Sequence, residues 1–306
     1  WLPERPGRWT AEPHWPSARI VDSTWLLGPG TQDSLSEDSS CSGGGSLNRQ
    51  LPQDSAAQSD KPLVRLCSPQ DCGMASGEYF PFAFGPEFPD EQSVDDARSA
   101  NFDSAVLTED IAIVGAPRLT LKAQSDQDYG LLCVRLCDLR PDGESALVSL
   151  GLLNLTHRHQ SEQPEPVLPG QVMDLEITLD DIAYRIPAGH KLRIAVSTSY
   201  WPFVWPSPGL FEIVVSDGTL HLPLRPDATD SVQFEAPEGA TPWAVDVLRD
   251  SVSTRELCKD EASGVRHVHI VNDFGEYRDR NHGLLSGSVT RETWSIHPDD
   301  PLSATA

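Results

Sequence analysis

Two pairs of histidines stand two residues apart, His157 with His159 and His267 with His269. Alternate residues of a β-strand point to the same face, so each pair could begin a transition-metal site. A catalytic zinc site needs a third protein ligand, and no further residue stands at a suggestive spacing. We therefore expect both pairs to be solvated at strand ends, and we predict neither a metal site nor a cofactor.

A single histidine, His190, follows Gly189 directly before an apparent strand. It could act as a catalytic base, or it could be a turn residue hydrogen-bonded to the backbone. A base needs a nucleophile, and the chain has no G-x-S-x-G elbow of the kind that carries an α/β-hydrolase serine. Neither phosphate-binding glycine motif, G-x-x-x-x-G-K-[ST] or G-x-G-x-x-G, occurs either. We expect His190 to be a turn residue, and we predict no catalytic residue in this chain.

The charge and the cysteines narrow the classes of protein. The 46 acidic and 23 basic residues give a formal charge of −23, which repels phosphate backbones and argues against nucleic-acid binding. No apolar run approaches the roughly 18 residues of a membrane span. The cysteines form no C-x-x-C pair, and we interpret them as reduced thiols of a cytoplasmic protein. They are Cys41, Cys67, Cys72, Cys133, Cys137 and Cys258.

The elements that must position these residues are strands. Short runs rich in Val, Ile, Leu and Thr recur between turn signals, and long helical periodicity is absent. The clearest runs are 18–27, 118–123, 131–139, 144–156, 172–179 and 190–198. Arg140-Pro141-Asp142-Gly143 suits a tight turn between two of them, and Asp217-Gly218 is the strongest two-residue hairpin signal.

Composition divides the chain further. Residues 32–60 are rich in Ser, Gln, Gly and Asp, which predicts a loop that is at least partly mobile. Residues 77–89 combine aromatic side chains with proline and predict a structured aromatic loop. A boundary near residue 227 separates a β-sandwich (1–227) from an antiparallel β extension (228–306). The extension could pack on the sandwich or continue it, and we favour packing.

Several segments resemble, in the same order, the C-terminal region of the X-Pro dipeptidyl-peptidase and CocE/NonD hydrolase family. IPAGHKLR (186–193) is similar to the family's PAGH strand, and VRLCD followed by RPDG (134–143) is similar to its hairpin. The other matching segments are 90–104, 107–117, 199–202, 277–283 and 294–301. Each motif is short, and the shared order over residues 90–306 gives the resemblance its specificity.

The resemblance implies an all-β fold, a jelly-roll sandwich related to galactose-binding-like domains, that follows an α/β-hydrolase domain. The Ser-Asp-His triad of the family lies in that earlier domain, which would be the partner of this chain; a homo-oligomer is a further option. The chain begins at Trp1 without an initiator Met, and we interpret it as part of a longer protein. Family members cleave esters, acylated β-lactam amides or Xaa-Pro peptides. In the family, the position of His190 is a structural turn.

The sequence departs from the family in two places. The family often has a Gly-Gly pair before the Asp-Gln segment, where this chain has CGMASG (72–77). After Trp201 this chain continues with PFVWPSP (202–208) in place of the family's Asp-Arg-Asn type of sequence. A substrate therefore does not transfer from any one member. We expect the chain to cover and shape the cleft of the hydrolase domain.

Aromatic residues are the candidate contacts. Tyr79, Phe80, Phe82 and Phe84 of the aromatic loop could cap the sandwich core or line the acyl pocket of the hydrolase domain. Two alternatives remain open. The chain could be a carbohydrate-binding module whose exposed Tyr200, Trp201 and Trp205 stack on a sugar, or a purely structural or dimerising sandwich.

Overall fold

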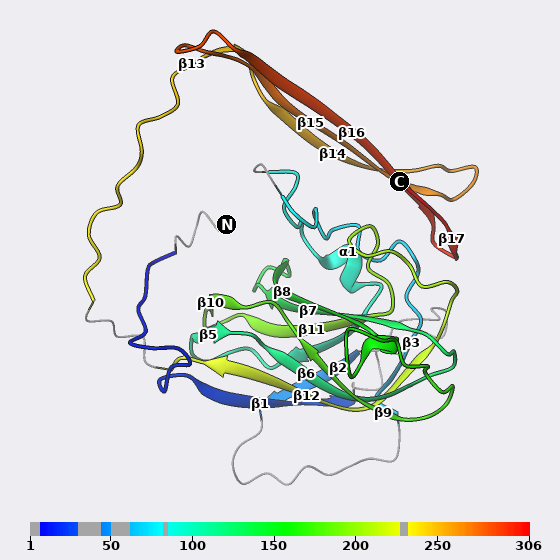
Figure 1. Cartoon of the computed structure of the whole chain (residues 1–306). Helices are drawn as coiled ribbons and strands as arrows, with labels where there is room; N and C mark the ends of the chain where they lie inside the picture. Colours follow the sequence, from blue (N-terminus) through cyan, green and yellow to red (C-terminus); the bar gives the residue numbers. More distant parts are fainter. Residues whose placement is uncertain (1–6, 30–43, 50–61, 82–84, 227–231) are drawn as a thin grey trace.

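The computed structural model describes residues 7–29, 44–49, 62–81, 85–226 and 232–306 and is almost entirely β-structure (Figure 1). Within these residues the α-helix is a single turn, α1 (Ser93–Asp96), and a 3₁₀ turn follows β8 at Leu155–His157. No helix in this described part is long and apolar enough to cross a membrane. The predicted all-β class is confirmed.

Twelve strands form the larger sheet, which folds over itself as a jelly-roll sandwich. Its main path runs β10-β5-β12-β1-β2-β4-β11-β7-β8, and β3, β6 and β9 branch from it. The strands are β1 (Val21–Pro29), β2 (Gly44–Arg49), β3 (Val64–Leu66), β4 (Ala100–Ser104), β5 (Ile111–Gly115), β6 (Arg118–Ser125), β7 (Leu131–Leu139), β8 (Ser145–Asn154), β9 (Met173–Thr178), β10 (Ile182–Ile186), β11 (Lys191–Ser197) and β12 (Ile213–Leu224).

Alternation along the strands builds the core of the sandwich. In β9, Met173, Leu175 and Ile177 are buried, whereas the polar residues between them are exposed, as the strict two-residue period predicts. Strand β7 differs because eight of its nine residues are buried, including two charged ones, Arg135 and Asp138. Both faces of β7 are therefore covered, and any charge on it needs a partner inside the protein.

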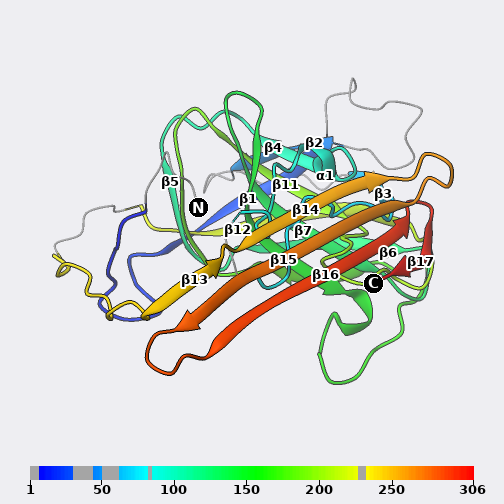
Figure 2. The same ribbon diagram turned by 90° about the horizontal axis from the view of Figure 1, so that it is seen from above.

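Five strands form the smaller antiparallel sheet: β13 (Val245–Arg249), β14 (Val252–Lys259), β15 (Arg266–Asp279), β16 (Leu285–His297) and β17 (Asp300–Thr305). The predicted antiparallel extension is thus confirmed. Seen from above, this sheet lies over the sandwich (Figure 2). The last strand of the sandwich ends at Leu224 and β13 begins at Val245, while a domain boundary near residue 227 stays a prediction.

The loop between β3 and α1 joins the two sheets. Met74 of this loop and Trp201 pack with Val268, Ile270 and Ile296 of the smaller sheet in one apolar cluster. A guanidinium N–H of Arg255 (β14) donates to the Met74 carbonyl at 2.8 Å, and the Gln70 amide donates to the Pro298 carbonyl at 2.7 Å. The loop is therefore sandwiched between the two sheets (Figure 1).

Two local predictions were wrong. Residues 44–49, inside the predicted loop 32–60, form β2, which pairs with β1 and runs parallel to β4; residues 30–43 and 50–61 lie outside the described part. Asp217-Gly218 makes no hairpin turn, because both residues lie within β12 beside a β-bulge and pair with β6. A Cβ on Gly218 would come within 2.8 Å of Leu27 and Leu121, so close packing explains that glycine.

Candidate functional site

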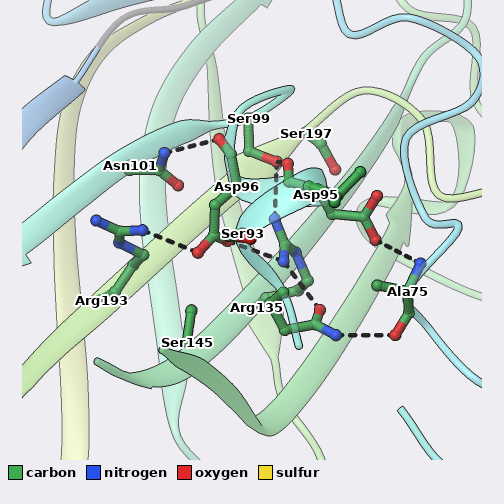
Figure 3. Close-up of polar contacts among 12 residues, drawn as sticks. Ala75, Ser93, Asp95, Asp96, Ser99, Asn101, Arg135, Ser145, Arg193 and Ser197 are labelled. Atoms are coloured by element: carbon green, nitrogen blue, oxygen red, sulfur yellow. Dashed lines mark hydrogen bonds and ion pairs between the residues drawn. The ribbon is translucent and has the colours of Figure 1, made fainter. Parts of the chain in front are cut away.

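A cluster of buried charges lies between α1 and strands β7 and β11 (Figure 3). The guanidinium of Arg135, whose side chain is fully buried, lies 2.9 Å from the carboxylate of Asp96. The other oxygen of Asp96 accepts from Arg193 at 2.8 Å, and Arg193 also donates twice to Asp103, each time at 2.7 Å. Gln92 and Ser99 each accept one hydrogen bond from Arg135 at 2.9 Å. These contacts fasten α1 to the sandwich.

A second carboxylate of α1 holds the loop between β3 and α1. The buried side chain of Asp95 accepts from the amides of Gly73 at 2.9 Å and Ala75 at 3.0 Å. The side-chain amide of Gln92 donates to the Ala75 carbonyl at 2.8 Å. Gly73 adopts a φ of +112°, and a Cβ there would lie 2.6 Å from the Tyr200 carbonyl carbon. The turn thus fits only a glycine against the segment that begins at Tyr200.

The pKa values of the cluster reflect burial opposed by neighbouring charge. Burial alone would lower the pKa of Arg135, but nearby charge, including that of Asp96, holds it above its ordinary value. Burial raises the pKa of Asp95, while Arg135 and the two loop amides oppose that rise. The ion pairs therefore keep the Arg135 guanidinium charged inside the sandwich. The cluster holds α1 in place against β7 and β11.

The loop and the Tyr200 segment together present exposed aromatic rings. The rings of Tyr79 and Phe203 meet edge to face with centroids 5.4 Å apart. Tyr79 is 78% exposed, Phe80 65% and Trp205 56%. We call Tyr79, Phe80, Phe203 and Trp205 the aromatic platform. Three of these rings are exposed, Phe203 is partly buried, and the Tyr79–Phe203 contact joins the two segments.

The sequence-predicted aromatics divide into three groups. Tyr79, Phe80 and Trp205 are exposed, whereas Phe82 and Phe84 lie outside the described residues. The predicted exposure of Tyr200 and Trp201 was wrong, because both side chains are 0% exposed. Tyr200 packs with Cys133 and Leu150, and Trp201 packs under the smaller sheet. Only Trp205 of that sugar-stacking trio is therefore accessible.

His190 pairs with a buried carboxylate. Its Nδ1 lies 2.6 Å from Asp138, which also accepts from the Tyr184 hydroxyl at 3.0 Å. The His190 amide donates to the Pro187 carbonyl and closes the predicted turn, and the His190 carbonyl accepts from the Leu107 amide. Within the described residues, no serine, threonine or cysteine is hydrogen-bonded to His190. The pair links β7 to the turn before β11.

The buried cysteines are poorly suited to nucleophilic chemistry. Burial raises the pKa of Cys72 and of Cys137 to about 12, and burial also raises the pKa of Cys133 well above its usual range. A thiol is nucleophilic as the thiolate, so these three groups are inert at neutral pH. Cys72, Cys133, Cys137 and Cys258 are free thiols, and Cys41 lies outside the described residues.

The two histidine pairs differ. His157 lies in a 3₁₀ turn after β8 ends at Asn154, so the expected shared strand face of His157 and His159 does not form. His267 and His269 do share one face of β15. In the part of the chain that the structure describes, no group of three or more His, Cys, Asp or Glu side chains is arranged to hold a metal ion.

Sequence reasoning missed the charged cluster as a unit. The sequence did contain one sign of this cluster. Arg135 is a charged residue within the apolar run 131–139, so it had to be buried and to need a charged partner. The cluster members Gln92, Asp96, Asp103, Arg135 and Arg193 all lie within segments that resemble the family. Those segments therefore contain the ion pairs that link α1 to the sandwich.

The fold and this cluster define the class, a jelly-roll β-sandwich held by buried ion pairs. Residues 2–233 match the family described as the X-Pro dipeptidyl-peptidase C-terminal non-catalytic domain. The chain belongs to that family. The smaller sheet lies beyond the matched residues.

Individual relatives are more distant. "Putative serine esterase Mb1866c" of Mycobacterium bovis is 28% identical over 127 residues, which span 36% of this chain and 20% of that protein; a Mycobacterium tuberculosis protein, "Putative serine esterase MT1883", matches equally. Among solved structures, an alpha-amino acid ester hydrolase has 18% identity and a TM-score of 0.51, covering 66% of this chain and 36% of that one. An aminopeptidase from a marine sediment Thaumarchaeota archaeon has 14% identity and a TM-score of 0.53, covering 71% and 39%.

Proposed function

We propose that this chain is the C-terminal, non-catalytic portion of a CocE/NonD-type serine hydrolase that cleaves acyl esters, acyl amides or Xaa-Pro peptides. Its partner is the α/β-hydrolase domain of the same protein. Two comparisons support this proposal. The family match describes a non-catalytic domain, and the chain spans between a fifth and two fifths of the relatives with esterase, hydrolase or aminopeptidase names.

We further propose that this chain covers and shapes the active-site cleft of the hydrolase domain, and the aromatic platform is the observation that supports this role. Tyr79 and Phe80 are held by a loop that Asp95 fixes through two backbone amides. Aromatic side chains on a loop that is anchored near its start lose less conformational entropy when they meet a partner. Phe82 and Phe84 belong to the same proposal as candidate pocket residues.

The test of the platform uses the full-length protein. Phe80→Ala and Trp205→Ala are expected to change kcat/KM for esters with bulky acyl groups more than for acetyl esters. Both side chains are mostly exposed in this chain, so neither change should cost this chain the ~3–5 kcal/mol of a buried aromatic. The matched control is Trp9→Ala, a tryptophan that is 83% exposed and far from the platform in sequence. Equal specificity ratios in all three variants would remove the cleft-shaping role.

The proposal of a non-catalytic portion has its own test. Residues 1–306 alone should not hydrolyse p-nitrophenyl acetate or butyrate, and a serine-reactive fluorophosphonate should not label them. Stoichiometric labelling of one serine would contradict this part of the proposal without touching the platform.

A further inference from the structure

The inner face of the smaller sheet is covered at one end and exposed at the other. We define this face by Val268 and Ile270 of β15, which pack with Trp201 of the sandwich. Asn272 follows on the same face and is also buried, because alternate residues of a strand share a face. Phe274, the next residue of this series, lies at a β-bulge and is 37% exposed. The cover along β15 therefore ends between Asn272 and Phe274.

The inner face continues beyond the bulge with Tyr277. Asn272 pairs with Thr290 of β16, and Tyr277 pairs with Ser286 of the same strand. Thr290 and Ser286 are four residues apart, so Tyr277 lies on the same face as Asn272. Val247 of β13 is the register partner of Tyr277 and shares this face.

Trp243 adds a third aromatic ring to this end of the inner face. Its ring centroid lies 6.5 Å from that of Tyr277, and its Nε1 donates to the Asp279 carboxylate at 2.9 Å. Because this hydrogen bond occupies the one donor of the indole, the exposed ring offers apolar and aromatic contact. Trp243 is 60% exposed and Val247 is 55% exposed. We call Trp243, Val247, Phe274 and Tyr277 the inner patch.

The outer face of the same region carries ion pairs. Arg249 pairs with Asp273, and Arg280 pairs with Asp246 at 2.8 Å. Both aspartates directly neighbour inner-face residues in their strands, so they point to the outer face. Exposed ion pairs suit a solvated surface, whereas exposed apolar side chains gathered in one place mark an interaction surface. The two faces therefore differ in character.

The connection from the sandwich to β13 is long and exposed. Residues 232–244 contain no helix or strand, and each of them is exposed. Figure 1 shows this segment running along one side of the molecule from the sandwich to β13. A segment of this length can span roughly 40 Å when extended, and structureless connections of this length are uncommon inside compact domains. The connection is therefore long enough to pass around a further domain.

We propose that the inner patch is a docking surface for the α/β-hydrolase domain of the same protein, so that the smaller sheet lies over both domains. This inference rests on the proposed function. The partner surface is apolar, because the inner patch offers aromatic rings and one aliphatic side chain.

Three observations favour this occupant over a second copy of the chain. The first described residues, from residue 7, lie on the side of the smaller sheet that faces the sandwich, so a preceding domain is attached on the side that the inner patch faces (Figure 1). The inner face also adjoins the aromatic platform, because Asn272 is hydrogen-bonded to Glu78, the residue before Tyr79. The two solved relatives are large enough to supply such a domain, since the matched region is 36% and 39% of their chains.

The experiment compares two valines of the smaller sheet in the full-length protein. Val247 belongs to the inner patch, whereas Val252 pairs with Asp273 on the outer face, and they are 55% and 58% exposed in this chain. Val247→Cys and Val252→Cys are each labelled with a maleimide, and the labelled peptides are measured by mass spectrometry. The Val247→Cys thiol is expected to react roughly 10-fold or more slowly, because a covered thiol reacts only when the interface opens. In urea the two rates should become equal.

Each outcome decides one point. Equal rates in the native full-length protein overturn the docking surface. Protection that disappears on dilution, together with dissociation of an oligomer in light scattering, assigns the patch to a second copy and also overturns the proposal. Hydrolysis of p-nitrophenyl esters by the same samples tests the proposed function separately. A full-length protein without hydrolysis or fluorophosphonate labelling overturns that function and with it this occupant. Thermal unfolding checks the fold of both variants, and Phe274→Cys replaces Val247→Cys if the latter does not fold.

Discussion

Replacing Asp96 by Asn tests whether one carboxylate neutralises the buried arginine of the sandwich. The substitution keeps the size of the side chain and removes its charge. Arg135 then retains its hydrogen bonds to Gln92 and Ser99, at 2.9 Å each, but loses the anion 2.9 Å away. Its side chain is fully buried, so water cannot replace that anion.

The expected loss of stability is large. Removing one partner of a buried ion pair costs about 3–5 kcal/mol, because the remaining charge is left uncompensated. Arg193 adds little to this loss, since its two contacts with Asp103 persist. A domain of ordinary stability has ~5–15 kcal/mol in total. The thermal midpoint should therefore fall by on the order of 10 °C.

The assay is thermal and denaturant unfolding followed by near-ultraviolet circular dichroism. The matched control is Asp103→Asn, which weakens a partly exposed pair with Arg193 and should cost about 1 kcal/mol or less. The double variant Asp96→Asn/Arg135→Met should recover part of the loss, because it removes both buried charges. If Asp96→Asn lowers the midpoint no more than Asp103→Asn, Asp96 does not neutralise Arg135.

Three further changes probe the loop between the sheets. Gly73→Ala should destabilise the protein by roughly 1–3 kcal/mol in unfolding assays, more than Gly143→Ala, because both have positive φ but only Gly73 meets backbone atoms within 3 Å. Trp201→Ala should cost ~3–5 kcal/mol and speed proteolysis of residues 232–244, and normal resistance would show that the apolar cluster does not hold the smaller sheet. Burial raises the pKa of Glu78 above its ordinary value of 4.5, and the nearby Glu87 and Glu292 carboxylates add to this rise. Protonated Glu78 therefore favours the folded state, and this stabilisation is present below pH 4.5. It is lost as the pH rises through the pKa of Glu78 in the folded protein. Glu78→Gln should therefore raise the unfolding midpoint near pH 7 relative to wild type; an unchanged difference between pH 4 and pH 8 would refute this.

The sequence alone determined the features that local patterning controls. Strict alternation in residues 172–179 predicted which side chains of β9 are buried, because a strand has one buried and one solvated face. Pro141 and Gly143 identified the turn between β7 and β8, since their backbone preferences are local. The ordered motifs of residues 90–306 identified the family, and the family match includes most of them.

Tertiary structure decided every feature that depends on neighbours distant in the chain. Asp217-Gly218 has the composition of a hairpin, yet β6 and β1 pair along both sides of β12 and keep that strand continuous. Residues 44–49 have few apolar groups, yet two strands lie beside them and supply the backbone hydrogen bonds. Trp201 and Trp205 have the same side chain four residues apart, and only Trp201 lies under the smaller sheet. Burial and pairing are properties of the assembled chain, which is why composition could not distinguish these cases.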